Sequence, residues 1–215
     1  MKNGKLIKEL TTLGYLKVSS VYDAFTHVDR IHFISGEAKQ DAHHNLPIAI
    51  NDTEVTSQPV IVAFLLELLE AKTGEKILEI GTGSGWQTAL LAHIVAKKSK
   101  QIATVGSVIS IERLPTLAEE AIKHIEQYHF ISDGIVKIIV GDGSGGHEGE
   151  APYDKIISSV RCESIPKKWK EQLRIGGRIV APVRESIVVI DKRGPELFSK
   201  RQYFGYSFSP IISEQ

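Results

Sequence analysis

Apolar residues recur at helical spacing along the first part of the chain. Residues 5–35 predict two helices separated near Gly14, and Ser19 or Ser20 can cap the second. Their apolar positions are Leu6, Ile7, Leu10 and Leu13 in the first helix and Val21, Phe25 and Val28 in the second. Residues 36–57 show no clean period and contain turn residues such as Gly36 and Pro47, so they predict a long loop. Loops of that length in a compact domain are often functional.

From residue 59 onward, helical patterns alternate with short apolar runs. The predicted helices cover 59–74, 85–95, 116–128 and 167–173, and the predicted strands cover 76–80, 107–111, 136–140, 154–158 and 178–183. This alternation is typical of an α/β fold with a buried, mostly parallel sheet covered by helices. Residues 187–191 and 203–209 follow without a clear helix between them, so they predict an antiparallel C-terminal edge.

Length and composition narrow the classes of protein. A chain of 215 residues fits one sizeable domain. Its 26 basic and 26 acidic residues balance, which argues against binding to bulk nucleic acid or to an acidic membrane surface. The single cysteine excludes an internal disulfide and suits a reducing compartment. With no apolar run of membrane-spanning length and no signal-type start, we expect a cytoplasmic protein.

A glycine-rich turn follows the first predicted strand. Gly81, Gly83 and Gly85 stand between the strand and the next helix, where glycines let the backbone approach a ligand at the helix N-terminus. The spacing Gly-x-Gly-x-Gly differs from the dinucleotide fingerprint and disfavours a nicotinamide oxidoreductase. Glu79 just before the turn would repel a diphosphate but attract a cationic amino-acid group such as that of S-adenosylmethionine.

Acidic residues also follow the next two predicted strands. Glu112 can accept hydrogen bonds from a ribose diol, or it is simply a solvated acid. Asp142 and Gly143 can contact an adenine ring, or they form an ordinary Asp-Gly turn. Because ligands of open α/β sheets bind at the carboxyl edge, the three strand tips together favour a nucleoside-containing ligand.

These residues resemble a known family. Residues 78–85 are similar to the cofactor loop of class I S-adenosylmethionine-dependent methyltransferases, a fold that is Rossmann-like and doubly wound. Other segments resemble the protein-L-isoaspartate O-methyltransferases in particular, and they lie at 21–25, 28–30, 33, 46–48, 56–59, 141–143, 151–154, 176–178 and 182. The resemblance implies a single methyltransferase domain over 1–215, with an N-terminal helical extension and substrate-side loop at 1–58 and the core at 59–215.

The resemblance also implies residue roles. The methionine moiety of the cofactor S-adenosyl-L-methionine would lie against the glycine loop, the ribose on Glu112 and the adenine against Asp142 and Gly143. The residues assigned to the cofactor are Glu79, Gly81, Thr82, Gly83, Ser84, Gly85, Glu112, Asp142 and Gly143. Ser57 matches the active-site serine of the family. The implied substrates are isoaspartyl-containing proteins or peptides, and we expect a monomer with no metal, nucleic-acid or membrane partner.

Three segments depart from the family pattern, all on the acceptor side. Residues 48–56 carry no glycine, residues 158–163 include two charges, and Ser209 stands where the family generally has valine. An acceptor other than isoaspartate, including a small molecule, is therefore an alternative, as is a non-catalytic cofactor-binding homologue.

The expected chemistry needs few side chains. An acceptor carboxylate is ionised near neutral pH, so methyl transfer requires orientation and not a general base. The Ser57 hydroxyl can orient that carboxylate, or Ser57 can cap the helix that starts at Pro59. We expect His43 and His44 to be solvated, His93, His124 and His129 to be surface or packing residues, and Cys162 to be structural. The run at 97–100 is expected to be a solvated loop.

Overall fold

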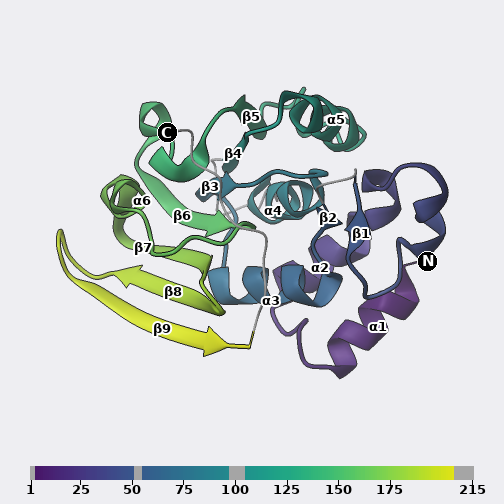
Figure 1. Ribbon diagram of the computed structural model, residues 1–215, viewed down its shortest axis with the longest axis horizontal. Coiled ribbons are helices and arrows are strands. Elements are labelled where there is room, and N and C mark those ends of the chain that lie inside the picture. Colours follow the sequence, from purple (N-terminus) through teal and green to yellow (C-terminus); the bar gives the residue numbers. More distant parts are fainter. Residues whose placement is uncertain (1–2, 51–54, 97–104, 206–215) are drawn as a thin grey trace.

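A seven-stranded sheet forms the centre of the molecule (Figure 1). The computed structural model describes residues 3–50, 55–96 and 105–205. Within these ranges the strands lie in the order β5-β4-β3-β6-β7-β8-β9. Their bounds are β3 Lys76–Ile80, β4 Ser107–Glu112, β5 Val136–Val140, β6 Tyr153–Ser158, β7 Leu173–Val183, β8 Ser186–Lys192 and β9 Phe198–Phe204.

The direction of the strands confirms the predicted fold class. Strands β5, β4, β3, β6 and β7 pair in parallel, whereas β7–β8 and β8–β9 are antiparallel. The chain order reverses between β3 and β6, which is the switch point where open α/β sheets bind ligands. The sheet is therefore mostly parallel, with the antiparallel C-terminal edge that the sequence predicts.

Helices cover both faces of the sheet, because the buried strands present apolar side chains to both faces. The six α-helices assigned in the described ranges are α1 Gly4–Thr12, α2 Ser19–His27, α3 Pro59–Leu69, α4 Trp86–Ala96, α5 Pro115–Glu126 and α6 Lys167–Gln172. Ile77, Val108 and Ile157 face the larger apolar cluster, which contains α3 and α4. Leu78 and Ile156 face the opposite cluster, closed by Trp169 of α6.

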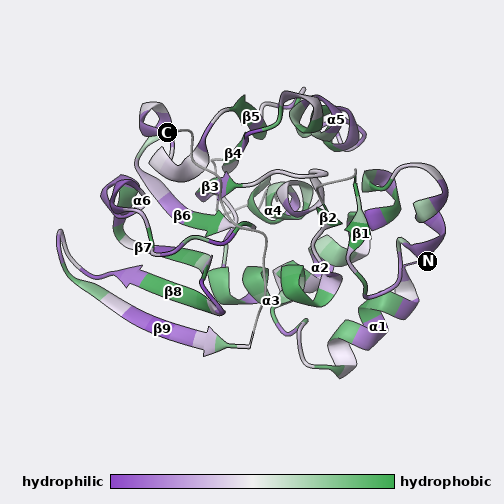
Figure 2. Cartoon of the chain, in the orientation of Figure 1, coloured by the Kyte–Doolittle hydropathy of each residue, from purple (hydrophilic) through white to green (hydrophobic). Residues whose placement is uncertain are grey.

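The N-terminal helices share the core of the larger face. Leu6 and Leu10 of α1 and Phe25 of α2 are fully buried in the same apolar cluster as strand residue Ile77. Phe25 also meets Trp86 edge-on, with ring centroids 5.3 Å apart. Figure 2 shows hydrophobic positions continuing from these helices into α3 and the central strands. None of the helices in the described ranges combines the length and apolarity that crossing a bilayer requires.

Several predicted boundaries differ from the structure. The predicted loop at 36–57 contains a 3-10 helix, η2 Gly36–Asp41, and a two-stranded ribbon of β1 Ile48–Ala49 and β2 Val55–Thr56. Helix α3 ends at Leu69 because Glu70 takes a left-handed conformation, so the predicted end at 74 was wrong. The last strand covers Phe198–Phe204 instead of 203–209, and residues 206–209 lie outside the described part of the chain.

Candidate active site

The glycine loop turns the chain from β3 into α4. Gly81 and Gly85 have φ values of +88° and +89°, which side chains other than glycine adopt only with strain. The backbone N–H of Gly85 donates to the carbonyl of Thr82 at 3.0 Å, and α4 begins at Trp86. The loop therefore presents bare backbone at the carboxyl end of β3, next to a helix N-terminus.

Glu112 joins the tip of β4 to this loop. Ile80 pairs with Ile111 in the parallel register, which places Glu112 directly beside the loop. The backbone N–H of Gly83 donates to Glu112 Oε2 at 2.9 Å, and that of Leu114 donates to Oε1 at 3.0 Å. Glu112 is only 7% exposed, so it is not the solvated acid that the sequence left open. Each oxygen retains a further lone pair for a hydroxyl donor.

Asp142 lies beyond β5, which is next to β4 in the sheet. Its Oδ1 accepts from the N–H of Ser144 and its Oδ2 from the Ser144 hydroxyl, each at 2.8 Å, so it caps the 3-10 turn η3 (Gly143–Gly145). A Cβ on Gly143 would lie 2.6 Å from Ile80 Cγ2, so only glycine lets this turn pack on β3. Asp142 therefore forms the Asp-Gly turn that the sequence left as an alternative, and this turn follows the carboxyl end of β5.

Glu79 lies beneath the loop in a buried polar network. The carboxylate is fully buried and accepts from Thr88 Oγ1 at 2.5 Å, Ser110 Oγ at 2.7 Å and Gln87 Nε2 at 3.0 Å. Burial raises the pKa of Glu79 to about 7, and the three hydrogen bonds only partly oppose that shift. Glu79 therefore places a negative charge below the loop only when it has lost its proton, and its oxygens already accept hydrogen bonds from these three side chains.

The pKa of Glu79 makes a pH-dependent contribution to stability. The folded protein holds the proton up to about pH 7, whereas the unfolded chain releases it near the ordinary glutamate value. The contribution of Glu79 to the free energy of unfolding is therefore fully present at low pH and is lost as the pH rises through about 7. We expect Glu79→Gln to remove this loss, so that its free energy of unfolding relative to wild type rises by about 3 kcal/mol between acidic and mildly alkaline pH. Urea titrations across that pH range measure the difference, and parallel curves would contradict it.

Thr82 and Ser84 are also buried, at 4% and 6% exposure. Thr82 Oγ1 shares a 2.6 Å hydrogen bond with Ser110 Oγ, which connects the loop to the Glu79 network. Sequence reasoning missed Ser110, although it stands opposite Glu79 in the β3–β4 register. Two polar residues at matching positions of adjacent apolar strands were the signal that could have found it.

Ser57 lies between β2 and α3, and it is half-buried. The N-cap residue of α3 is Gln58, so the alternative that Ser57 caps this helix was wrong. Thr56 pairs with Ile48 in the β1–β2 ribbon. The nearby Ile50 side chain would lie 3.9 Å from a Cβ placed on Gly83, so this ribbon reaches the glycine loop.

Arg30 also belongs to the site. From the sequence it contributed only to the family resemblance and was given no role. It is fully buried, and burial lowers its pKa to about 10. Its guanidinium lies 5.2 Å from the ring centroid of Trp86, and Nη2 donates to Thr56 Oγ1 at 2.5 Å and to the Ser57 carbonyl at 3.1 Å. Nη1 donates to the Ala42 and His44 carbonyls at 3.5 and 3.3 Å. Arg30 thus holds the Ser57 segment against Trp86, the first residue of α4.

Other candidate residues lie elsewhere. His43 contacts Asp29 at 2.7 Å, and His44 contacts Asp41 at 3.0 Å. Cys162 is buried, its thiol donates to the Pro182 carbonyl, and burial raises its pKa to about 11, in agreement with the predicted structural role. The basic run at 97–100 and the departures from the family pattern at 51–54 and 209 lie outside the described residues.

Sequence comparisons identify the family of the chain. The family model described as protein-L-isoaspartate(D-aspartate) O-methyltransferase matches residues 1–215. A protein-L-isoaspartate O-methyltransferase of Methanopyrus kandleri is 33% identical, and the match covers 98% of this chain and 91% of that protein. Protein-L-isoaspartate O-methyltransferase 2 of Archaeoglobus fulgidus is 38% identical over 90% of this chain and 85% of the relative.

The fold matches a solved structure of the same kind. An isoaspartate methyltransferase of Plasmodium falciparum, in complex with S-adenosyl-L-homocysteine, superposes with a TM-score of 0.84 and 21% identity. The match covers 98% of each chain, which shows that the two share the whole fold, including the N-terminal extension. From the family model and the sequence relatives, the chain belongs to the protein-L-isoaspartate(D-aspartate) O-methyltransferase family.

Proposed function

We propose that the three strand tips bind S-adenosylmethionine and that the Ser57 segment presents an L-isoaspartyl carboxylate to it. The reaction is assigned from membership of the family. It is methyl transfer to the free carboxylate of isoaspartyl residues in damaged proteins. One observation supports this location of the cofactor site: the glycine loop, Glu112 and Asp142 lie at the same edge of the sheet. In this proposal residues 1–215 act as one domain, in which 1–58 supply the substrate side.

The residues at this edge suit the cofactor. A Cβ placed on Gly83 would meet only Ile50, at 3.9 Å, so the loop leaves space there for the amino-acid moiety, and Glu112 has acceptors for the ribose hydroxyls. Asp142 and Gly143 stand one strand further, where an adenine would lie. Buried Glu79 would stabilise an ammonium group above the loop by charge complementarity. When bound, S-adenosylmethionine supplies a methyl group on a positively charged sulfur.

On the substrate side, the protein has to orient an existing nucleophile. A carboxylate is ionised at neutral pH, so no side chain has to remove a proton. The Ser57 hydroxyl can donate one hydrogen bond that aims the carboxylate without neutralising it. Arg30 fixes the backbone of Ser57 through its carbonyl, which makes Arg30 a positioning residue. Ile50, whose Cδ1 would lie 3.9 Å from a Cβ on Gly83, places an apolar side chain beside the loop on this side.

The role of Ser57 can be isolated from cofactor binding. We expect Ser57→Ala to reduce kcat/KM for an isoaspartyl peptide by about 10–100-fold, the cost of one orienting hydrogen bond, because the acceptor loses its donor. Calorimetry should show unchanged binding of S-adenosylhomocysteine, because Ser57 is not among the cofactor residues. Unchanged turnover would remove Ser57 from the mechanism.

The partners follow from the same proposal. The balanced charge of 26 basic and 26 acidic residues supports a protein or peptide substrate and no nucleic acid. We propose a monomeric enzyme working in the cytoplasm, for which the single buried cysteine is suited. Sedimentation of the purified protein tests the monomer.

The decisive experiment uses labelled S-adenosylmethionine with two peptides that differ only in one residue. The isoaspartyl peptide should be labelled and the normal aspartyl peptide should not. Labelling of neither, with cofactor binding confirmed by calorimetry, would retain the cofactor site and contradict the proposed acceptor. Absence of cofactor binding would contradict the proposed site itself.

A further inference from the structure

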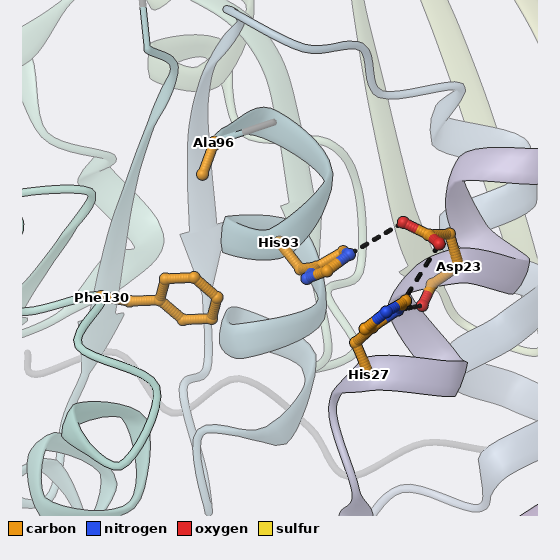
Figure 3. Close-up of a pocket in the computed structure, with 5 residues that line it drawn as sticks. All are labelled: Asp23, His27, His93, Ala96 and Phe130. Carbon is orange, nitrogen blue, oxygen red and sulfur yellow. Dashed lines mark hydrogen bonds and ion pairs between the residues drawn. The ribbon is translucent and has the colours of Figure 1, made fainter. Parts of the chain in front are cut away.

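Two helices bring a carboxylate and two imidazoles together outside the strand-tip site. Asp23 and His27 are one turn apart on α2, and His93 lies two turns after the start of α4. Together with Ala96 and Phe130 they line a pocket of about 370 Å³ (Figure 3). Sequence reasoning took His93 for a surface or packing residue, and it did not connect His93 with α2.

The contacts in this cluster centre on Asp23. Its Oδ2 lies 3.0 Å from His93 Nε2, and its Oδ1 lies 3.5 Å from His27 Nδ1. The two imidazole rings are stacked, with centroids 5.0 Å apart and planes at 17°. Figure 3 shows both rings directed toward the Asp23 side chain. Three groups that can bind a metal therefore meet at one point between two helices.

These distances suit a small divalent ion. In a tetrahedral site with metal–ligand bonds of about 2.0–2.1 Å, neighbouring ligand atoms are about 3.3 Å apart. One ligand atom from each of the three residues lies within 4.8 Å of the others, so the site needs the ligands to move closer together by about 1 Å as the ion binds. Two nitrogen ligands disfavour Mg²⁺ and Ca²⁺, which prefer oxygen, and favour Zn²⁺ and similar ions.

We propose that Asp23, His27 and His93 bind one divalent transition-metal ion of the Zn²⁺ type, with a water from the pocket as fourth ligand. The side chains of Asp23 and His93 are 31% and 23% exposed and that of His27 is 58% exposed, so an ion can enter from solvent. The ion replaces the protons that His27 and His93 direct at Asp23. It also replaces the 2.8 Å bond from His27 Nδ1 to the Asp23 carbonyl.

The bound ion would link α2 of the N-terminal extension to α4. Helix α2 already packs on α4 through Phe25 and Trp86, and the glycine loop leads directly into Trp86. A ligand that binds only the folded state stabilises it. Metal binding should therefore raise the thermal stability of the whole chain without taking part in methyl transfer.

The test uses full-length protein without a histidine tag, stripped with a chelator and titrated with Zn²⁺. Calorimetry should give one ion per chain, and Co²⁺ should give the visible absorption of a tetrahedral site. At 100 times Kd, Zn²⁺ should raise Tm by about 5 °C or more. We expect His27→Ala and His93→Ala each to weaken binding by about 100-fold or more, since loss of a residue that only orients a ligand already costs about 10–100-fold.

His44→Ala is the matched control. His44 also pairs with one aspartate, Asp41 at 3.0 Å, and its side chain is 52% exposed, but it is not among the grouped ligands. The control should bind Zn²⁺ as wild type does, and circular dichroism of each stripped variant confirms that it is folded. No saturable binding by the wild type would overturn the proposal. Wild-type affinity in both His27→Ala and His93→Ala would do so as well.

Discussion

Glu112→Ala is expected to weaken binding of S-adenosylhomocysteine by about 100-fold, because two hydrogen bonds from the ribose to a charged acceptor, each about 1.5 kcal/mol, are lost. The substitution also leaves the N–H groups of Gly83 and Leu114 without their acceptor, which loosens the glycine loop. Calorimetry with the purified protein measures the Kd directly. Methyl transfer should fall in parallel at subsaturating cofactor.

Two variants make this result specific. Glu119→Ala removes an exposed carboxylate from the first half of α5 and should leave the Kd unchanged. Glu112→Gln keeps an oxygen for Gly83 but loses the charge, so we expect an intermediate Kd, weaker by about tenfold. A Kd for Glu112→Ala within threefold of wild type would show that the ribose does not bind there.

Arg30→Met should separate the substrate side from the cofactor side. Methionine fills much of the volume but donates no hydrogen bonds, so the carbonyls of Ala42, His44 and Ser57 lose a buried donor. We expect the free energy of unfolding to fall by about 2–4 kcal/mol. We also expect kcat/KM for the isoaspartyl peptide to fall at least about tenfold, because the Ser57 segment is no longer fixed.

The cofactor affinity of Arg30→Met is the informative control. It should stay within about threefold of wild type, because Glu112 and the glycine loop are untouched. Arg193→Met removes a guanidinium whose side chain is 60% exposed and paired with Asp191, and it should cost less than about 1 kcal/mol. An equal loss of peptide turnover and of cofactor affinity in Arg30→Met would show a general loss of structure in place of positioning.

The strand tips could be predicted because their signals are local. A buried parallel strand is an apolar run, and the residue after it stands at the carboxyl edge whatever the helices do. The register places Glu112 at the carboxyl edge, where the sequence predicts it, and the structure adds its contact with Gly83. The assignment of individual cofactor residues stays a prediction, and Glu79 lies below the loop with its carboxylate bonded to Thr88.

The features that the sequence did not predict depend on contacts between residues far apart in the chain. A buried arginine breaks the expectation that charges are solvated, and only the fold shows that Arg30 has four oxygen acceptors. The last strand was placed too late because Tyr203 and Phe204 carry the aromatic pattern of a strand. Residues 199–202 of this strand are polar, and their place in the sheet is set by pairing with β8, which begins with Phe198 opposite Lys192.

The charged character of β9 has a consequence for an enzyme whose clients are damaged proteins. In the described part of the sheet β9 pairs only with β8 (Figure 1) and is largely hydrophilic (Figure 2). Lys200 and Arg201 of this strand are exposed. Long basic side chains on an outer strand oppose the addition of a foreign strand. Damaged polypeptides that lose structure expose unpaired backbone, so we expect this charged edge to disfavour their pairing with the sheet.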